Sequence, residues 1–282
     1  MIVDVKGYVG VDVEQCYKEK KLNAYRSFIG DWSVKIIDGE ETIYFTDFAG
    51  THCQYTLPRN STIVVKNNEI IFCKQNFDTT GRYYIPPYGW HKQTQYFNLW
   101  KAVDQSVHDR VHHLDPNKTI LLLSSGHDSG VIACSLLRQN YNFKVISLRG
   151  EEESEILKKR CDLFSDSIIV DGWERGGGWD FLFNYLEEGY NIISGLGADE
   201  LYTSEDFEIL ERFFSESNKL HQKNINTIYP LCDYRIWRQY WALEPKYIRG
   251  RHKAPLLKYM EQYDFPVYYG PKISFGILSK KN

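Results

Sequence analysis

A short apolar run that leads directly into a loop of small polar residues constrains the fold more than any other feature of this sequence. Thr119–Leu123 is almost wholly apolar and does not alternate, which is typical of a strand buried in a parallel sheet. The loop Ser124-Ser125-Gly126-His127-Asp128-Ser129-Gly130 follows, and residues 129–139 then have a helical pattern. The sequence therefore predicts a strand, a loop and a helix in succession, the unit from which α/β folds are built.

Strand-like and helix-like segments alternate through the second part of the chain. Further strands are predicted at residues 144–148, 167–170 and 190–194, and helices at residues 100–112, 154–164 and 179–187. From Glu205 to the end the sequence is mainly helical in pattern. Because the connections are short, we expect an open parallel sheet with helices on both faces.

The first ninety residues have a different pattern. Short β-rich runs occur at residues 32–37, 42–46, 61–66 and 69–74, with turn signals between them. Pro86-Pro87-Tyr88-Gly89 then interrupts the pattern, as a connector does. We therefore divide the chain into a smaller β-rich domain, residues 1–90, and an α/β domain, residues 91–282.

Charge and composition argue against several classes of protein. The net charge is −3, whereas proteins that bind a nucleic-acid backbone usually carry a strong basic excess. No apolar run approaches the roughly 20 residues that span a bilayer. The six cysteines include no C-x-x-C pair, so neither a zinc nor a redox site is indicated. With no signal-peptide pattern at the start, we expect a cytoplasmic protein with reduced thiols.

The loop after the first buried strand has the properties of a phosphate site. Its small residues allow a ligand close to the backbone, and the start of a helix favours an anion. Asp128 would repel bare phosphate, so its presence suggests a bridging Mg²⁺. The alternative is a capped turn without a ligand, because Ser and Asp are common helix caps. A Ser-His-Asp hydrolase does not fit, since His127, Asp128 and Ser129 are consecutive and a triad needs residues from separate places.

A second loop follows the strand predicted at residues 190–194. It reads Ser194-Gly195-Leu196-Gly197-Ala198-Asp199-Glu200-Leu201-Tyr202 and should lie at the same edge of the sheet. Its glycines offer a close wall for a nucleotide, and its carboxylates offer a second Mg²⁺ ligand. The alternative is a turn that leads into a solvated acidic helix start.

Together the two loops resemble motifs of a known family. The first is similar to the PP-loop, S-G-G-x-D-S, of the ATP-pyrophosphatases, with Ser125 in place of the first glycine. The second resembles S-G-E-G-x-D-E-L-F of the class B asparagine synthetases. Tyr229–Asp233 resembles the family's P-F-L-D segment, and Gly250–Leu257 its later lysine-containing segment. The resemblance extends over about residues 100–259 and implies an adenine nucleotide alpha-hydrolase-like fold.

The resemblance also implies a role for each matching residue. The residues implied to hold ATP and pyrophosphate are Leu123, Ser124, Ser125, Gly126, Asp128, Ser129, Leu148, Ser194 and Gly195. Asp128 and Asp199 would ligate Mg²⁺, and Lys253 would offset negative charge at the reacting phosphate. Taken alone, Lys253 would more often be a solvated lysine at a helix start. Asp233 is expected to be a helix cap rather than a catalyst.

Two departures from the family pattern limit what it implies. Leu196 occupies the position of a glutamate in asparagine synthetases and a tyrosine in β-lactam-forming synthetases, and leucine can neither accept nor donate a proton. Glu200 or a group on the substrate then becomes the candidate base. Gly30-Asp31-Trp32 and Thr46–Thr51 resemble part of the family's glutaminase domain. That domain uses an amino-terminal cysteine, however, and residue 2 here is Ile2, so we expect a truncated and inactive remnant.

The sequence thus predicts an asparagine-synthetase-like, AMP-forming carbon–nitrogen ligase that requires ATP and Mg²⁺. It would adenylate a small-molecule carboxylate and transfer it to ammonia or another amine, without glutaminase activity of its own. Two alternatives remain: an inactive relative that binds nucleotide or a partner, and another PP-loop enzyme, such as one that modifies tRNA. The carboxylate, the amine and the oligomeric state are left open.

Overall fold

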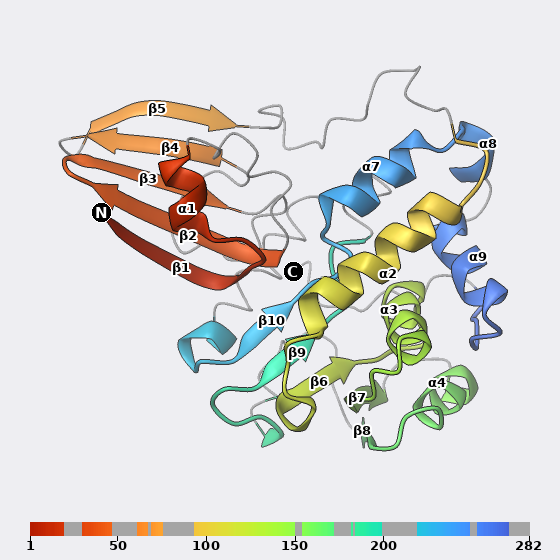
Figure 1. The fold of residues 1–282 in the computed structure, drawn as a ribbon. Helices are drawn as coiled ribbons and strands as arrows, with labels where there is room; N and C mark the ends of the chain where they lie inside the picture. Colours follow the sequence, from red (N-terminus) through yellow and green to blue (C-terminus); the bar gives the residue numbers. More distant parts are fainter. Residues whose placement is uncertain are drawn as a thin grey trace, which may run out of the picture.

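The chain has an α/β fold with two separate sheets (Figure 1). The computed structural model describes residues 1–19, 30–46, 61–66, 69–75, 93–149, 154–171, 182, 184–198, 219–248 and 253–270. Within these ranges one sheet is antiparallel and comes from the amino-terminal part, and the other is parallel and flanked by helices. The boundary expected at residue 90 lies outside the described residues.

The antiparallel sheet is a meander of five described strands in chain order. They are β1 (Ile2–Val9), β2 (Gly30–Asp38), β3 (Glu41–Thr46), β4 (Ser61–Lys66) and β5 (Glu69–Gln75), with the short helix α1 (Val13–Lys18) beside them. Alternate residues of β2, which are Trp32, Val34 and Ile36, point to one face and form a small core with Phe45 and Val13. The four predicted strands are confirmed, whereas β1 and α1 were not predicted.

The parallel sheet has the order β10-β9-β6-β7-β8. Its strands are β6 (Thr119–Leu122), β7 (Lys144–Arg149), β8 (Ser167–Asp171), β9 (Asn191–Ile193) and β10 (Asn226–Ile228). From β6 the chain builds outward through β7 and β8, and it then returns to add β9 on the other side of β6. The order therefore reverses between β6 and β9, and such a switch point is where open α/β sheets bind ligands.

Both faces of this sheet are covered by apolar residues. On one face Leu121, Val145 and Ile193 join a large core with the helices. On the other, Ile120, Ile146 and Ile192 pack against a smaller set of apolar residues, namely Leu182, Leu186, Leu220 and Ile225. Adjacent residues of one strand serve opposite cores, which explains why the strands are apolar without alternation.

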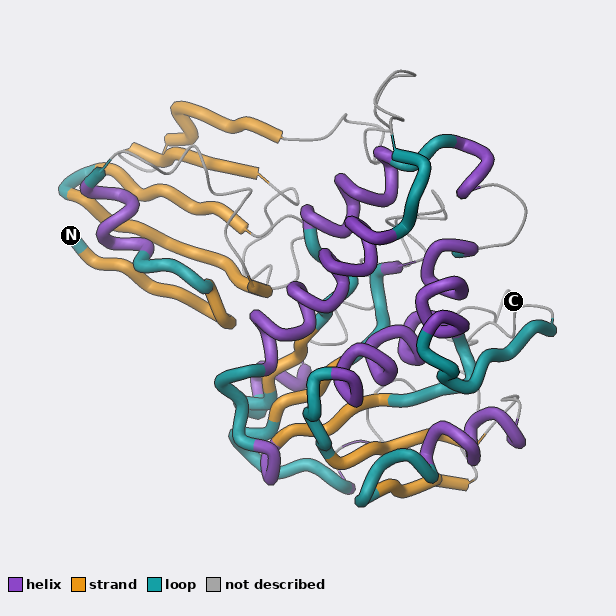
Figure 2. The backbone as a smooth tube through the Cα atoms, turned by 45° about the vertical axis from the view of Figure 1, so that its right-hand side comes forward, coloured by secondary structure: helices purple, strands orange, loops and turns teal. Residues whose placement is uncertain are grey.

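The helices of the larger core gather on one side of the parallel sheet (Figure 2). They are α2 (Phe97–Val111), α3 (His127–Arg138), α4 (Ser154–Cys161), α7 (Tyr234–Ala242), α8 (Pro245–Ile248) and α9 (Ala254–Gln262), and a 3₁₀ turn at Pro116–Lys118 precedes β6. None of the helices in the described part of the chain is both long and apolar enough to cross a bilayer.

Two expectations about secondary structure need correction. Of the helix expected at residues 179–187, the described residues form only a 3₁₀ turn around Leu182, where Tyr185 N–H donates to the Leu182 carbonyl. Residues 186–187 are not helical, and Gly189 has a φ of +83°, a left-handed conformation that suits a turn. The region after residue 205 was expected to be mainly helical, but it also contributes β10, which is only three residues long.

Candidate functional site

The two loops that resemble nucleotide-binding motifs meet at the switch point of the parallel sheet. The first follows β6 and the second follows β9, the neighbouring strand. Gly195 lies directly on the first turn of α3. A Cβ atom on Gly195 would stand 2.6 Å from the backbone nitrogen of Ser129 and 2.8 Å from the carbonyl carbon of Asp128. The site thus depends on backbone-to-backbone contact that only glycine allows at this position.

We expect Gly195→Ala to separate the loops, because the atoms that its methyl group would meet belong to the backbone and cannot rotate away. The free energy of unfolding should fall by about 1–3 kcal/mol, the usual cost of overpacking. Affinity for nucleotide, measured by calorimetry on the folded protein, should fall as well.

Gly39→Ala is the matched control for Gly195→Ala. Gly39 has a φ of +61° with open space around its Cβ position, so alanine there strains a turn far from the loops by about 1–2 kcal/mol. A similar loss of stability with unchanged nucleotide affinity is the expected result. If Gly195→Ala also left the affinity unchanged, contact between the loops would have no part in binding.

Hydroxyl groups fix the shape of the first loop from within. The Ser124 and Ser129 hydroxyls lie 2.7 Å apart, and Ser129 Oγ accepts from the Ser124 backbone N–H at 3.0 Å. Ser124 Oγ accepts from the Gly126 backbone N–H at 3.2 Å. Helix α3 begins at His127 after the cap residue Gly126, which has no side chain to bond to the first amides. These early amides have no acceptor within the helix, which makes them suitable donors to a phosphate.

Lys253 reaches the first loop from a position 125 residues further along the chain. Its ammonium group donates to both carboxylate oxygens of Asp128, and its side chain is only 4% exposed. The alternative of a solvated lysine at a helix start is therefore wrong. Lys253 also precedes α9 in a left-handed conformation with a φ of 55°, which costs a non-glycine residue about 1–2 kcal/mol. The surrounding contacts must offset that cost.

The other predicted site residues fall into three groups. Leu123 before the first loop, Ser125 within it and Ser194 at the start of the second loop are all buried. The backbone N–H groups of Leu123 and Ser194 donate to the Ile146 and Ile228 carbonyls and so extend the sheet ladder. Leu148 belongs to β7, but its side chain is not described. Asp199 and Glu200 lie outside the described residues, so the second metal ligand and the substitute base stay predictions.

The chemistry of Asp128 suits a magnesium ion. Its side chain is 23% exposed, and both of its carboxylate oxygens accept from the Lys253 ammonium group. Mg²⁺ usually keeps several waters and takes one or two protein carboxylates. A single aspartate, or Asp128 together with Asp199, would therefore satisfy its usual coordination. No cluster of three or more His, Cys, Asp or Glu side chains occurs in the described part of the chain.

Leu196 is half-buried and packs against both cores of the parallel sheet. Its backbone N–H donates to Ser194 Oγ at 3.3 Å, and its carbonyl accepts from the Cys232 thiol at 3.6 Å. Leu196 therefore fixes the second loop by packing, and it provides no proton-transferring group where the resembling families have one.

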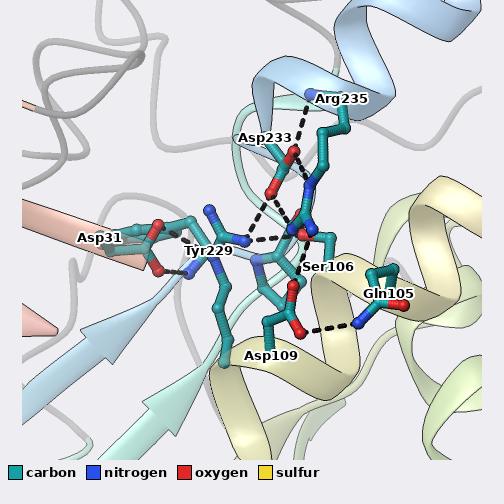
Figure 3. A network of polar contacts seen from close by, with 9 residues as sticks. Asp31, Gln105, Ser106, Asp109, Tyr229, Asp233 and Arg235 are labelled. Atoms are coloured by element: carbon teal, nitrogen blue, oxygen red, sulfur yellow. Dashed lines mark hydrogen bonds and ion pairs between the residues drawn. The ribbon is translucent and has the colours of Figure 1, made fainter. Parts of the chain in front are cut away.

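A buried ionic network joins α2 and the segment Tyr229–Asp233 to the antiparallel sheet (Figure 3). Arg110 of α2 bonds to Asp31 of β2 at 3.2 Å and to Asp233 at 2.7 Å, and all three side chains are at most 5% exposed. The second Asp31 oxygen accepts from the Tyr229 backbone N–H at 2.8 Å. The segment Tyr229–Asp233, which contacts Leu196 through Cys232, is thereby tied to the amino-terminal sheet.

The charges in this network are strongly coupled. Burial would raise the pKa of Asp233, but the charges of Arg110 and Arg235 and their hydrogen bonds hold that pKa well below its usual range. Burial would lower the pKa of Arg110, but the two aspartates raise it above its usual value. Asp233 also caps α7 by accepting from the Arg235 backbone N–H at 2.7 Å, so its predicted role as a helix cap is confirmed.

Arg160 and His127 contact the site without having been assigned to it from the sequence. Arg160 of α4 is fully buried, and its guanidinium bonds to the Ser124 and Gly126 carbonyls at 2.6 and 2.7 Å. His127 Nε2 lies 2.9 Å from the Tyr268 carbonyl, and burial lowers the pKa of its imidazole. A neutral ring that donates from Nε2 fits this contact. The only signal in the sequence was the position of His127 within the loop.

Comparisons with known proteins do not identify a family. No model of a protein family matches the sequence, and no curated protein matches it. Among solved structures, S. aureus TarJ is 12% identical with a TM-score of 0.30, over 92% of this chain and 79% of that chain. Bacillus subtilis protein yhfP, solved with NAD bound, is 12% identical with a TM-score of 0.28, over 82% and 80%. The quinone oxidoreductase from Thermus thermophilus, solved also with NADPH, is 10% identical with a TM-score of 0.24, over 94% and 78%. Likenesses of this size support no conclusion about fold or ligand.

Proposed function

We propose that this chain is an asparagine-synthetase-like ligase of the PP-loop type, with an adenine nucleotide alpha-hydrolase-like α/β domain. It binds ATP with Mg²⁺, adenylates a carboxylate with release of pyrophosphate, and passes the acyl group to ammonia or another amine. The observation that carries the proposal is the convergence of three distant segments on the start of α3. The loop after β6, Gly195 and Lys253 all meet there.

The proposed chemistry assigns a role to each part of this convergence. A carboxylate oxygen attacks the α-phosphorus of ATP, and the bond from that phosphorus to the bridging oxygen of pyrophosphate breaks. Negative charge gathers at this step, and Lys253 is the buried cation that would offset it. Asp128 would hold Mg²⁺, which neutralises phosphate charge, and the first amides of α3 would donate to pyrophosphate.

The second half of the reaction requires an amine to attack the acyl carbon, with AMP as the leaving group and loss of a proton. Leu196 cannot take that proton, because it has no basic group and packs into both cores. Glu200 or the substrate itself would take it. An amine that is largely unprotonated before it binds would depend least on a base supplied by the protein. The acceptor therefore need not be ammonia, and the product need not be asparagine.

ATP–pyrophosphate exchange with labelled pyrophosphate tests the proposal directly. The assay is run over a panel of carboxylic acids that begins with aspartate, since only an enzyme that forms an acyl-adenylate reversibly returns the label to ATP. Exchange that depends on one acid and on Mg²⁺ is the expected result. If no acid supports exchange and calorimetry detects no Mg²⁺·ATP binding, the ligase proposal is wrong.

A second function, binding of nucleotide without turnover, is favoured by one specific observation. Lys253 and Asp128 are paired with each other, so each of the two groups required for adenylation engages the other. Binding of Mg²⁺·ATP without exchange in any acid would favour this function over the ligase.

A further inference from the structure

We infer that Arg160 is a positioning residue of the first loop, residues 124–130. By bonding to the loop carbonyls it sets the direction of the loop amides. It also binds the segment after α9, residues 263–270, at the same point. The inference deepens the proposed function, on which it rests for the identity of the ligand. Arg160 comes from α4, an element that carries none of the motifs that resemble the family.

The hydrogen bonds of Arg160 converge on the backbone. Nη1 donates to the Ser124 carbonyl at 2.6 Å and to the Gly126 carbonyl at 2.7 Å, and Nε donates to the Pro266 carbonyl at 2.9 Å. The planar guanidinium presents several N–H groups in a fixed fork, so one side chain can hold several carbonyls at set angles. Arg160 is fully buried, although its neighbours Lys158 and Lys159 on the same helix are exposed.

Because the peptide bond is planar, the contacts that hold these carbonyls also set the direction of the N–H group that follows each carbonyl. In a trans peptide the carbonyl and the following N–H point in opposite directions, and no cis peptide occurs in the described part of the chain. Holding the Ser124 carbonyl therefore directs the Ser125 N–H away from Arg160, and holding the Gly126 carbonyl does the same for His127. Two backbone donors, one within the loop and one at the start of α3, are thus oriented by the Arg160 side chain.

Gly130 makes room for the guanidinium. A Cβ atom on Gly130 would stand 2.7–2.8 Å from three guanidinium atoms of Arg160. The last glycine of the loop therefore has a packing role: it lets α3 pass directly over the buried arginine. This provides a second way to disturb Arg160 without removing its charge.

The segment after α9 is bound at the same place. Arg160 holds the Pro266 carbonyl, and its guanidinium carbon lies 5.3 Å from the centroid of the Phe265 ring. His127, the next residue after Gly126, contacts the Tyr268 carbonyl at 2.9 Å. The loop and the chain that follows α9, the helix that Lys253 precedes, are therefore held together by two side chains.

Two measurements on the 282-residue chain test the inference. Calorimetry gives the affinity for Mg²⁺·pyrophosphate and Mg²⁺·ATP, and hydrogen exchange gives the protection of the amides of residues 124–130. Arg160→Met should weaken binding roughly ten- to a hundredfold, as loss of a supporting partner does at other preorganised sites. It should also raise exchange at the loop but not at α2. Arg160→Lys should recover only part of the loss, because a lysine cannot hold several carbonyls in a fork.

Arg138→Met is the matched control. Arg138 lies at the end of α3 and bonds to Asp104 and the Tyr259 hydroxyl, so its loss affects packing but not the loop. Binding and loop exchange should stay as in the wild type. If Arg160→Met fails to fold, Gly130→Ala replaces it, and it should produce the same loosening of the loop.

The outcomes separate the inference from the proposed function. If the wild type binds pyrophosphate and neither the Arg160 variants nor Gly130→Ala change affinity or loop exchange, the inference about Arg160 is overturned. If the wild type binds neither ligand but the Arg160 variants loosen the loop, the proposed function fails while the positioning role is retained.

Discussion

Replacing Lys253 with methionine is expected to slow acid-dependent ATP–pyrophosphate exchange by about a hundredfold or more. The substitution removes a buried cation that bonds to both carboxylate oxygens of Asp128. Removing a single preorganised group that stabilises transition-state charge typically costs about 10²–10³ in rate. Asp128→Asn should have an effect of at least similar size, because it also removes the proposed Mg²⁺ ligand.

Lys258→Met is the matched control for Lys253→Met. Lys258 belongs to the following helix, α9, and its partner is Glu261 at 2.5 Å on the surface. An exposed pair of this kind contributes little to stability and should contribute nothing to the reaction. If Lys253→Met catalyses ATP–pyrophosphate exchange at the same rate as Lys258→Met, the role proposed for Lys253 is wrong. A deficit in kcat with little change in the KM for ATP would show that the lysine acts on the transition state.

The second large effect concerns stability. Arg110→Met should lower the free energy of unfolding by about 3–5 kcal/mol, because it leaves the carboxylates of Asp31 and Asp233 buried without the cation that joins them. Denaturant unfolding gives this free energy. Arg238→Met, an exposed arginine on α7, is the control and should stay within about 0.5 kcal/mol of the wild type.

Two further outcomes distinguish electrostatics from lost packing in Arg110→Met. If the cost comes from uncompensated charge, adding Asp31→Asn and Asp233→Asn should recover part of it. If these changes only add to the loss, packing of the arginine stem dominates and the ionic explanation fails.

The same network predicts how stability depends on pH. The pKa of Asp233 is lower in the folded chain than its ordinary value of 3.8, because Arg110 and Arg235 favour the charged form. The unfolded chain therefore binds more protons in this range, and the contribution of Asp233 is complete above pH 3.8 and lost as the pH falls below it. In Arg110→Met this acid dependence should be smaller, which can be measured by thermal unfolding across acidic pH.

Local patterns in the sequence predicted much of the fold. Val103, Val107 and Val111 recur at four-residue spacing, and all three are buried on one face of α2. Thr119–Leu123 predicted β6 because a strand covered on both faces has no polar side to alternate with. In contrast, β10 has three residues, too few to establish a period, and its identity as a strand depends on pairing with β9.

The candidate site could be predicted only where chemistry is local. The loop around Asp128 is continuous in sequence, so its strand, turn and helix start could be anticipated. The burial of Lys253 could not, because it depends on a partner 125 residues away. Arg160 was the hardest to anticipate, since Lys158-Lys159-Arg160 has the composition of a solvated helix face and only the fold buries its last member.

The contact between Asp31 and Arg110 limits how this chain can be truncated. Asp31 belongs to β2, but it bonds to Arg110 of α2 and accepts from the Tyr229 backbone N–H. A chain that began at residue 91 would leave Arg110 with one carboxylate of this network instead of two. The amino-terminal sheet therefore contributes to the stability of the buried network whether or not it performs any reaction.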